Sequence, residues 1–458
     1  MAQAATADRA LFTGYLPNDA PSIGPMVALA LQHVLTMFPA TVLVALLTNF
    51  DVGVTLFASG LATIVALFVS SRITGTYIPL YYGSSFSYIA PIVAITATNI
   101  YDIPDLATRI RIAQGGIIMT GLLNVLVGIA VRYVGKRTID RILPAEVTGS
   151  VAIVIGIALA FVAIGMAADN WTVSLITLIV TILASVYLRG RGFIGMIPVL
   201  IGVVVGYLIA LLLGLVDFTP VGQAAWLRVP AFSLPLFLPG AILAIAPIAI
   251  ATIPESTAHL YQISLYVDQL AVELRRPPIQ LSRFLGINLL VDGIGDMING
   301  LLGGAAGTNY GENNSLMAIT RNYSGPVLVT AGIIAILLGF VGKLAALVQT
   351  LPLAVTGGLS IYLFGVIGAQ GIALQMAEKV NLFDPRKLAI IAVILVIGIG
   401  GSIGYEGGMI PLFNVRVPAI ATAAVAGILL NLIFLIFPAG HIDAEFERVP
   451  VEEMELEV

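Results

Sequence analysis

The stretch that constrains this chain most reads Thr308-Asn309-Tyr310-Gly311-Glu312-Asn313-Asn314-Ser315-Leu316-Met317-Ala318-Ile319-Thr320-Arg321. It places a carboxylate and three amides within an otherwise apolar chain. Because a bilayer core offers no water to a carboxylate, Glu312 must face a cavity or a partner, and an ionisable residue in a membrane indicates a functional site. Glycine and asparagine also disfavour a continuous helix. A short, interrupted span with a carboxylate at its break is typical of substrate sites in secondary transporters.

The composition places the chain in the membrane. Of its 458 residues, 59% are hydrophobic and 10% are charged, whereas soluble domains have about 25% charged residues. The chain has no cysteine, which excludes disulfides, thiolate catalysis and Cys-ligated metal sites. The polar segment from Met1 to Asn18 does not resemble a signal peptide, so we expect the whole chain to be retained. Residues 439–458 are predicted to form a solvated acidic tail.

The hydropathy pattern predicts an all-α polytopic membrane protein with about fourteen transmembrane segments, since a spanning helix needs about 20 mainly apolar residues. The third segment contains Pro79, Gly83 and Pro91, and the tenth contains Gly311 and Asn313, so both are predicted to be broken. The predicted segments are 25–48, 52–71, 78–98, 110–134, 144–166, 171–188, 193–215, 233–257, 281–304, 309–320, 326–349, 351–374, 387–405 and 416–438.

Basic residues set the predicted orientation. Loops that follow even-numbered segments carry fourteen lysines and arginines, against four in loops that follow odd-numbered segments. Because cytoplasmic loops are enriched in positive charge, both termini are predicted to be cytoplasmic.

Internal similarity predicts two inverted repeats of seven segments. The recurring motifs are Val134-Gly135-Lys136 with Val341-Gly342-Lys343, at an offset of 207 residues, and Tyr82-Gly83-Ser84 with Tyr310-Gly311-Glu312, at an offset of 228 residues. Seven predicted segments separate the members of each pair, and an odd number inverts the second repeat. Substrate sites of such folds lie at the repeat interface near the membrane midplane.

Two pairs of polar residues inside segments are candidates for function. Glu255 and His259 lie four residues apart, so they share one helix face. Pro254 precedes them, and we expect a helix end that lines a cavity. The alternative is a static buried pair. A histidine at position 33, in the first segment, is open between a ligand role and a bond to a neighbouring helix.

Asp292 and Asp296 are also four residues apart. Asp292 is predicted to relay protons, and Asp296 is open between a relay and helix packing. The sequence Gly293-Ile294-Gly295-Asp296 raises the alternative of an intramembrane aspartyl protease. The Tyr101-Asp102 pair that this alternative needs falls in a loop, however, and the number of segments is too high.

Several motifs resemble the nucleobase/ascorbate transporter family, and the resemblance covers nearly the whole chain. These motifs are Gln32-His33-Val34-Leu35-Thr36-Met37-Phe38-Pro39-Ala40-Thr41, Tyr82-Gly83-Ser84-Ser85-Phe86, Glu255 with His259, and Tyr310-Gly311-Glu312-Asn313. Two positions depart from the pattern. Ser315 replaces an expected glycine where helices are expected to approach closely, and Phe364 stands where a close relative has tyrosine.

The resemblance implies a division into a core domain and a gate domain, with short strands in segments three and ten. The core would comprise 25–134 (segments 1–4) and 233–349 (segments 8–11), and the gate 144–215 (segments 5–7) and 351–438 (segments 12–14). The resemblance also implies a homodimer in a bacterial inner membrane. The lipid bilayer and a small molecule are the expected partners, without nucleic acid.

The resemblance also implies a substrate site. Glu255 and Glu312 would accept hydrogen bonds from a pyrimidine, and the backbone N–H groups of Phe86 and Gly311 would donate to its carbonyls. His259 would hold Glu255 or reach the ring through water. Three further residues complete the implied site: Ala40 lines the ring, Tyr310 flanks it, and Phe364 faces it from the gate side.

The expected function is secondary active import of a nucleobase by proton symport, without a cofactor and without enzymatic activity. The resemblance favours uracil, because purine carriers of this family usually have glutamine at the position of Glu312. Proton coupling is assigned to Glu255, His259 and Asp292, in preference to sodium. Two alternatives remain open: a same-fold carrier of xanthine or another purine, and a carrier of an inorganic anion of the sulfate-permease type. An anion site would favour helix N-termini and a basic residue instead of carboxylates.

Overall fold

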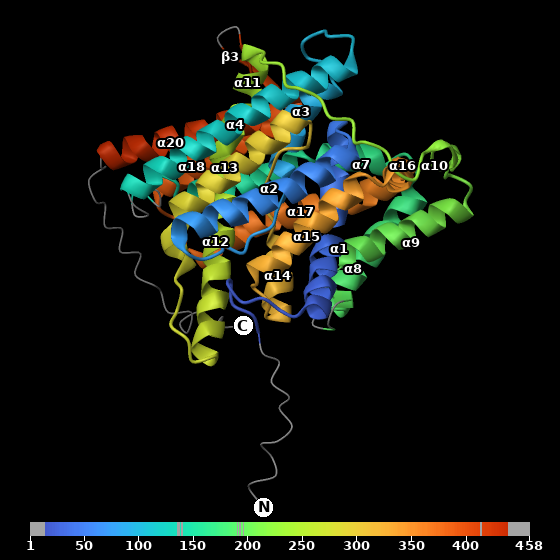
Figure 1. The fold of residues 1–458 in the computed structure, drawn as a ribbon. Coiled ribbons are helices and arrows are strands. Elements are labelled where there is room, and N and C mark those ends of the chain that lie inside the picture. The colour runs from blue at the N-terminus through green and yellow to red at the C-terminus, as the bar shows by residue number, and fades with distance from the viewer. Residues whose placement is uncertain are drawn as a thin grey trace, which may run out of the picture.

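The computed structural model describes residues 14–134, 138, 141–189, 191, 194–195, 197–412 and 415–437 (Figure 1). The predicted acidic tail, 439–458, lies outside these residues. Within the described residues, nine helices are long and apolar enough to cross a membrane, and four shorter apolar helices accompany them. The protein is therefore a mostly helical, multi-pass membrane protein. The total of about fourteen segments stays a prediction.

The elements follow the predicted segments closely at most positions. Their bounds are α1 (Ile23–Thr48), α2 (Val52–Thr74), β1 (Tyr82–Ser84), η1 (Phe86–Tyr88), α3 (Ile89–Thr96), α4 (Leu106–Val134), α6 (Ala145–Ala158), α7 (Ala160–Ala167), α8 (Trp171–Tyr187), α9 (Pro198–Leu212), α10 (Thr219–Gln223), α11 (Pro239–Ile245), η3 (Ala246–Ile248), α12 (Ala249–Glu273), η4 (Leu281–Phe284), α13 (Leu285–Leu302), β2 (Gly307–Asn309), α14 (Gly311–Thr320), α15 (Gly325–Gly339), α16 (Gly342–Gln349), α17 (Leu353–Ala377), α18 (Pro385–Leu395), η5 (Val396–Gly400), α19 (Gly401–Gly404), η6 (Glu406–Gly408), β3 (Met409–Leu412), β4 (Val415–Pro418) and α20 (Ala419–Ile436).

Glycines bring two long helix pairs into backbone contact. α13 packs along α4, and α15 packs along α2. A methyl group added at Gly121 of α4 would lie 2.5 Å from the carbonyl oxygen of Gly293. One added at Gly60 of α2 would lie 2.4 Å from that of Gly332. Small residues allow such close approach, which strengthens helix packing where no hydrophobic effect drives it.

The two predicted broken segments meet as a pair of short strands. β1 pairs with β2 in antiparallel register, with Tyr82 opposite Asn309 and Ser84 opposite Gly307. As the resemblance implied, a strand therefore precedes each of the short helices, η1 with α3 on one side and α14 on the other. Non-helical backbone is tolerated within a membrane only where its polar groups are satisfied by protein. The Ser59 hydroxyl accordingly donates to the Tyr82 carbonyl over 2.6 Å.

The elements differ from the predicted membrane segments at three places. The segment predicted to end at residue 257 continues as α12 to Glu273, because hydropathy records where a helix leaves the membrane and not where it ends. The segment predicted at 326–349 is two helices, with a break at Phe340 and Val341, where Val341 forms a bridge to Leu227. Residues 409–418 form the hairpin β3–β4, which hydropathy did not predict.

Candidate functional site

Two helix N-termini flank the strand pair, one at each end of it. Phe86 begins η1 and Gly311 begins α14, directly after the strands β1 and β2 end. The first N–H groups of a helix have no intrahelical partner, and the helix dipole adds partial positive charge there. The backbone groups that the resemblance assigned to substrate carbonyls therefore lie at two helix starts.

Glu255 and Glu312 place carboxylates beside the strand pair. Glu255 is half-buried on α12, and the Ser85 hydroxyl donates to its Oε2 over 3.3 Å. Glu312 lies in the first turn of α14 and is exposed. The two carboxylates are close enough for electrostatic repulsion. A site with two nearby acceptors and free backbone donors matches a small planar molecule that carries both N–H and C=O groups.

The expectation that Glu255 and His259 lie at a helix end was wrong. Both residues lie inside α12, and the irregular turn η3 directly precedes that helix, several residues before Glu255. The irregularity falls at Ala246–Ile248, where Pro247 removes a backbone donor. The shared face is nevertheless retained, since the two residues are one helical turn apart.

His259 packs against the start of α14. A methyl group added at Gly311 would lie 2.8 Å from its Nε2 atom, so an alanine there would displace the imidazole. The His259 carbonyl accepts a hydrogen bond from the Asn314 side chain over 3.1 Å. Its Nδ1 atom has no hydrogen-bond partner among the described residues, and no bond to Glu255 is seen there. The imidazole is thus positioned by α14 and not by the glutamate.

The other residues predicted to line the substrate site lie on different elements. Ala40 is buried on α1, and Phe86 makes an edge-to-face contact with Phe364 of α17, with ring centroids 5.9 Å apart. Tyr310 is buried, and its hydroxyl lies 2.9 Å from that of Thr41. Its ring packs so closely on β1 that a methyl group at Gly83 would lie 2.1 Å from it. Tyr310 therefore supports the strand.

The expected consequence of the Ser315 substitution was wrong. Ser315 is exposed, and its hydroxyl donates to the Gly311 carbonyl one turn earlier over 3.1 Å. Within the part of the chain that the structure describes, the side chain is therefore accommodated on the surface of α14.

Asp292 lies behind the strand β2. It is buried, its Oδ2 accepts from the Thr308 hydroxyl over 3.0 Å, and its Oδ1 has no hydrogen-bond partner among the described residues. A neighbouring cluster links three elements through polar side chains. The Ser256 hydroxyl accepts from Asn288 over 2.8 Å and from Asn309 over 2.9 Å. A continuous polar layer therefore connects α12, α13 and β2 next to Glu255.

Asp296 has a packing function. Its Oδ1 accepts from the Tyr82 hydroxyl over 2.6 Å and from the Gly307 backbone N–H over 2.9 Å. Its Oδ2 accepts from the Tyr88 hydroxyl over 2.9 Å and from Asn124 over 3.4 Å. One buried carboxylate thus joins β1, η1, β2 and α4, which favours the packing role of the two roles that the sequence left open.

His33 joins two helices. The Asn313 amide nitrogen lies 3.0 Å from His33 Nδ1, which connects α14 to α1. Of the two roles considered for this histidine, the interhelical bond is the one present in the structure.

Sequence reasoning missed several residues of the polar layer. Ser85, Ser256 and Asn288 received no role, although each contacts a site residue or its neighbour. One signal was available. Polar residues recur on α13 at spacings of four, four and three, which mark a single face of a helix; they are Asn288, Asp292, Asp296 and Asn299.

This arrangement defines the class of protein as a multi-pass membrane transporter built around two broken segments. A family model described as "Permease family" matches residues 24–407. The chain therefore belongs to this family, the nucleobase/ascorbate transporters that its motifs resemble.

Curated relatives cover nearly the whole chain. It is 38% identical over 431 residues to the uracil permease of Bacillus caldolyticus, spanning 91% of this chain and 93% of that protein. It is 38% identical over 428 residues to the uracil permease of Escherichia coli K12, again spanning 91% and 93%. It is 34% identical over 426 residues to the putative pyrimidine permease RutG of the same strain, spanning 91% and 90%.

Solved structures share the fold at low sequence identity. The transmembrane domain of the cyanobacterium bicarbonate transporter BicA aligns with a TM-score of 0.56 at 13% identity, covering 91% of this chain and 100% of that one. SLC26A9 aligns with a TM-score of 0.63 at 12% identity, covering 91% and 65%. Identities this low define the architecture and leave the substrate to the site residues.

Proposed function

We propose that this protein imports a nucleobase, uracil, across a bacterial inner membrane by proton symport. The observation that carries the proposal is the pair of carboxylates, Glu255 and Glu312, beside the helix starts at Phe86 and Gly311. The names of the curated relatives, two uracil permeases and a putative pyrimidine permease, support the same substrate class.

The chemistry of uracil matches these groups. Its ring presents N–H donors beside C=O acceptors. Glu255 and Glu312 accept from the N–H groups, while the backbone of Phe86 and Gly311 donates to the carbonyls. A buried site that hydrogen-bonds its substrate rejects analogues strongly, because a wrong ligand leaves polar groups unpaired. Ala40 and Phe364 contact the faces of the ring in this proposal.

Proton coupling rests on the polar layer. Glu255 alternates between protonated and ionised forms as the site opens to either side, and Asp292 exchanges its proton through the adjoining hydroxyl and amide groups. Among the described residues, Asp292 Oδ1 and His259 Nδ1 have no hydrogen-bond partner, which supports this assignment, because buried polar atoms without partners are rare and indicate function.

The proposed transport cycle is alternating access, in which a core domain moves against a gate domain. The helices α4 and α13 correspond to the predicted segments four and nine. The helices α2 and α15 correspond to segments two and eleven. The proposed inverted repeat relates segment four to eleven and segment two to nine, so it maps one helix pair onto the other. Both pairs pack through glycines. The protein is proposed to be a homodimer, with both termini in the cytoplasm.

The rival functions have weaker support. An anion carrier of the same fold would need positive charge where Glu255 and Glu312 lie. A purine carrier would use the same site with different contacts, and competition between xanthine and uracil for uptake tests this alternative. The protease alternative would need a free pair of aspartates, whereas Asp296 is bound by four donors and Asp102 lies in the loop between α3 and α4.

The direct test replaces each carboxylate by its amide. Glu255→Gln and Glu312→Gln should each weaken uracil binding to the purified protein by at least tenfold, since a hydrogen bond to a charged group contributes about 1.5–3 kcal/mol. Glu273→Gln is the matched control, because it lies at the far end of the same helix and pairs with Arg321. Control-like affinity in both site variants would refute the proposed site.

A further inference from the structure

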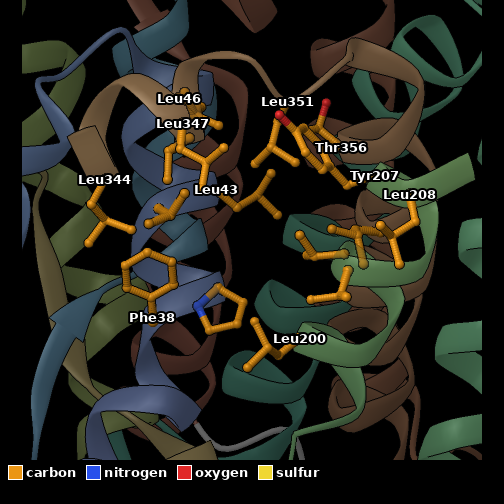
Figure 2. Close-up of a pocket in the computed structure, with 16 residues that line it drawn as sticks. Phe38, Leu43, Leu46, Leu200, Tyr207, Leu208, Leu344, Leu347, Leu351 and Thr356 are labelled. Atoms are coloured by element: carbon orange, nitrogen blue, oxygen red, sulfur yellow. The ribbon is translucent and has the colours of Figure 1, made fainter. Parts of the chain in front are cut away.

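An apolar cavity of about 200 Å³ lies outside this site. It lies between α1 and α16 of the predicted core and α9 and α17 of the predicted gate. Figure 2 shows Phe38 and Leu344 on one side of the cavity, facing Tyr207 and Leu208 on the other. The lining residues are Phe38, Pro39, Val42, Leu43, Leu46, Leu200, Val203, Val204, Tyr207, Leu208, Leu344, Leu347, Val348, Leu351, Thr356 and Leu359.

The lining excludes a polar ligand. None of these side chains is charged, and the Tyr207 hydroxyl is bound to that of Thr350 over 2.6 Å. Water in a cavity needs two to four polar partners, and a nucleobase needs more. The cavity therefore suits hydrocarbon.

The cavity wall reaches the exposed surface of α9. Two lining residues on α9, Val204 and Leu208, are 49% and 51% exposed. In a membrane-spanning protein, such exposed apolar side chains contact acyl chains. The opposite wall is deeply placed, since Val42 and Leu43 of α1 are only 4% and 3% exposed.

We propose that an acyl chain of a membrane phospholipid enters from the bilayer and occupies this cavity. The bound chain would lie between core and gate, against α1 from Phe38 to Leu46. The same turns of α1 carry Ala40 and Thr41, which are not part of the cavity wall. Thr41 is bonded to Tyr310 beneath the strand pair. The lipid site and the substrate site thus share one helix.

The test is photocrosslinking in proteoliposomes. The full-length protein is reconstituted with a phospholipid that carries a diazirine on its acyl chain, and adducts are mapped by mass spectrometry. Adducts are expected on residues 38–46 of α1. Leu429 of α20, which is 54% exposed, provides an internal reference for contact with bulk lipid. Val203→Trp, which fills the cavity, should lower the adducts on α1 at least fivefold relative to Leu429.

The matched control is Leu211→Trp, on the same helix but outside the cavity lining, and its adduct yield on α1 should stay within twofold of wild type. Val203→Phe replaces the first variant if the tryptophan prevents folding. Labelling at Leu429 without adducts on residues 38–46 would overturn the proposal. Undiminished α1 adducts in a folded cavity-filled variant would also overturn it.

Discussion

Asp296 shows how a single buried carboxylate can organise a site without contacting the proposed substrate. Its four donors come from β1, η1, β2 and α4, so it holds both broken segments against the same helix. The sequence could identify Glu255, Glu312 and Asp292, because charge inside apolar segments is costly wherever it occurs. It could not identify the tyrosine partners of Asp296. Tyr82 and Tyr88 lie more than two hundred residues away in the sequence, and a tyrosine by itself does not indicate a contact with an aspartate.

Asp296→Asn should destabilise the protein by about 1–3 kcal/mol, because the amide nitrogen cannot accept and leaves a buried donor unpaired. Thermal unfolding in detergent should show a clearly lower midpoint. Asp292→Asn is the comparison, since Asp292 accepts one bond and has a bare second oxygen. A larger loss of stability at position 292 than at position 296 would contradict the packing function.

The strand pair is the element whose geometry the sequence indicated best. Glycines, prolines and asparagines in two otherwise apolar segments predicted breaks. Gly83 lies in β1, as this prediction requires, whereas Gly311, Asn313 and Asn314 lie inside the helix α14 and the strand β2 precedes them. The limits of α12 could not be predicted in the same way, because helix and membrane end at different residues. The hairpin β3–β4 was missed because most of it lies between the apolar segments predicted at 387–405 and 416–438.

Gly83→Ala and Gly311→Ala should separate the support of the strands from the site itself. Alanine at position 83 would place a methyl group 2.1 Å from the buried Tyr310 ring, and such overpacking costs about 1–3 kcal/mol. Alanine at position 311 would approach only the end of the His259 side chain, at 2.8 Å. It should preserve the unfolding midpoint while weakening uracil binding. A Gly83→Ala variant as stable as wild type would show that the strand contact is looser than described.

At the scale of the whole molecule, glycine contacts between α4 and α13 and between α2 and α15 hold the proposed core together, while the apolar cavity separates α1 from α9. Hydropathy could predict a multi-pass membrane protein, because the length of apolar segments follows from the bilayer as a solvent. The orientation read from the charge distribution stays a prediction. The pairing of helices could not be predicted, since glycines throughout the chain allow many close contacts.

Proton symport predicts that uptake into cells rises as external pH falls and collapses with a protonophore. His259→Leu should reduce transport more than it reduces equilibrium binding, because histidine is the residue best suited to exchange protons near neutral pH. Sodium-dependent uptake that is insensitive to the protonophore would contradict proton coupling. Unchanged transport and pH dependence in the variant would leave the histidine a structural role against α14.

The most direct measurement is competition for radiolabelled uracil uptake in proteoliposomes of the purified protein under an imposed proton gradient. Uracil should accumulate, excess unlabelled uracil should abolish the signal, and xanthine, sulfate and bicarbonate should leave it largely unchanged. Glu312→Gln should show no accumulation above empty vesicles. Uptake of labelled sulfate or bicarbonate without uptake of uracil would contradict the account.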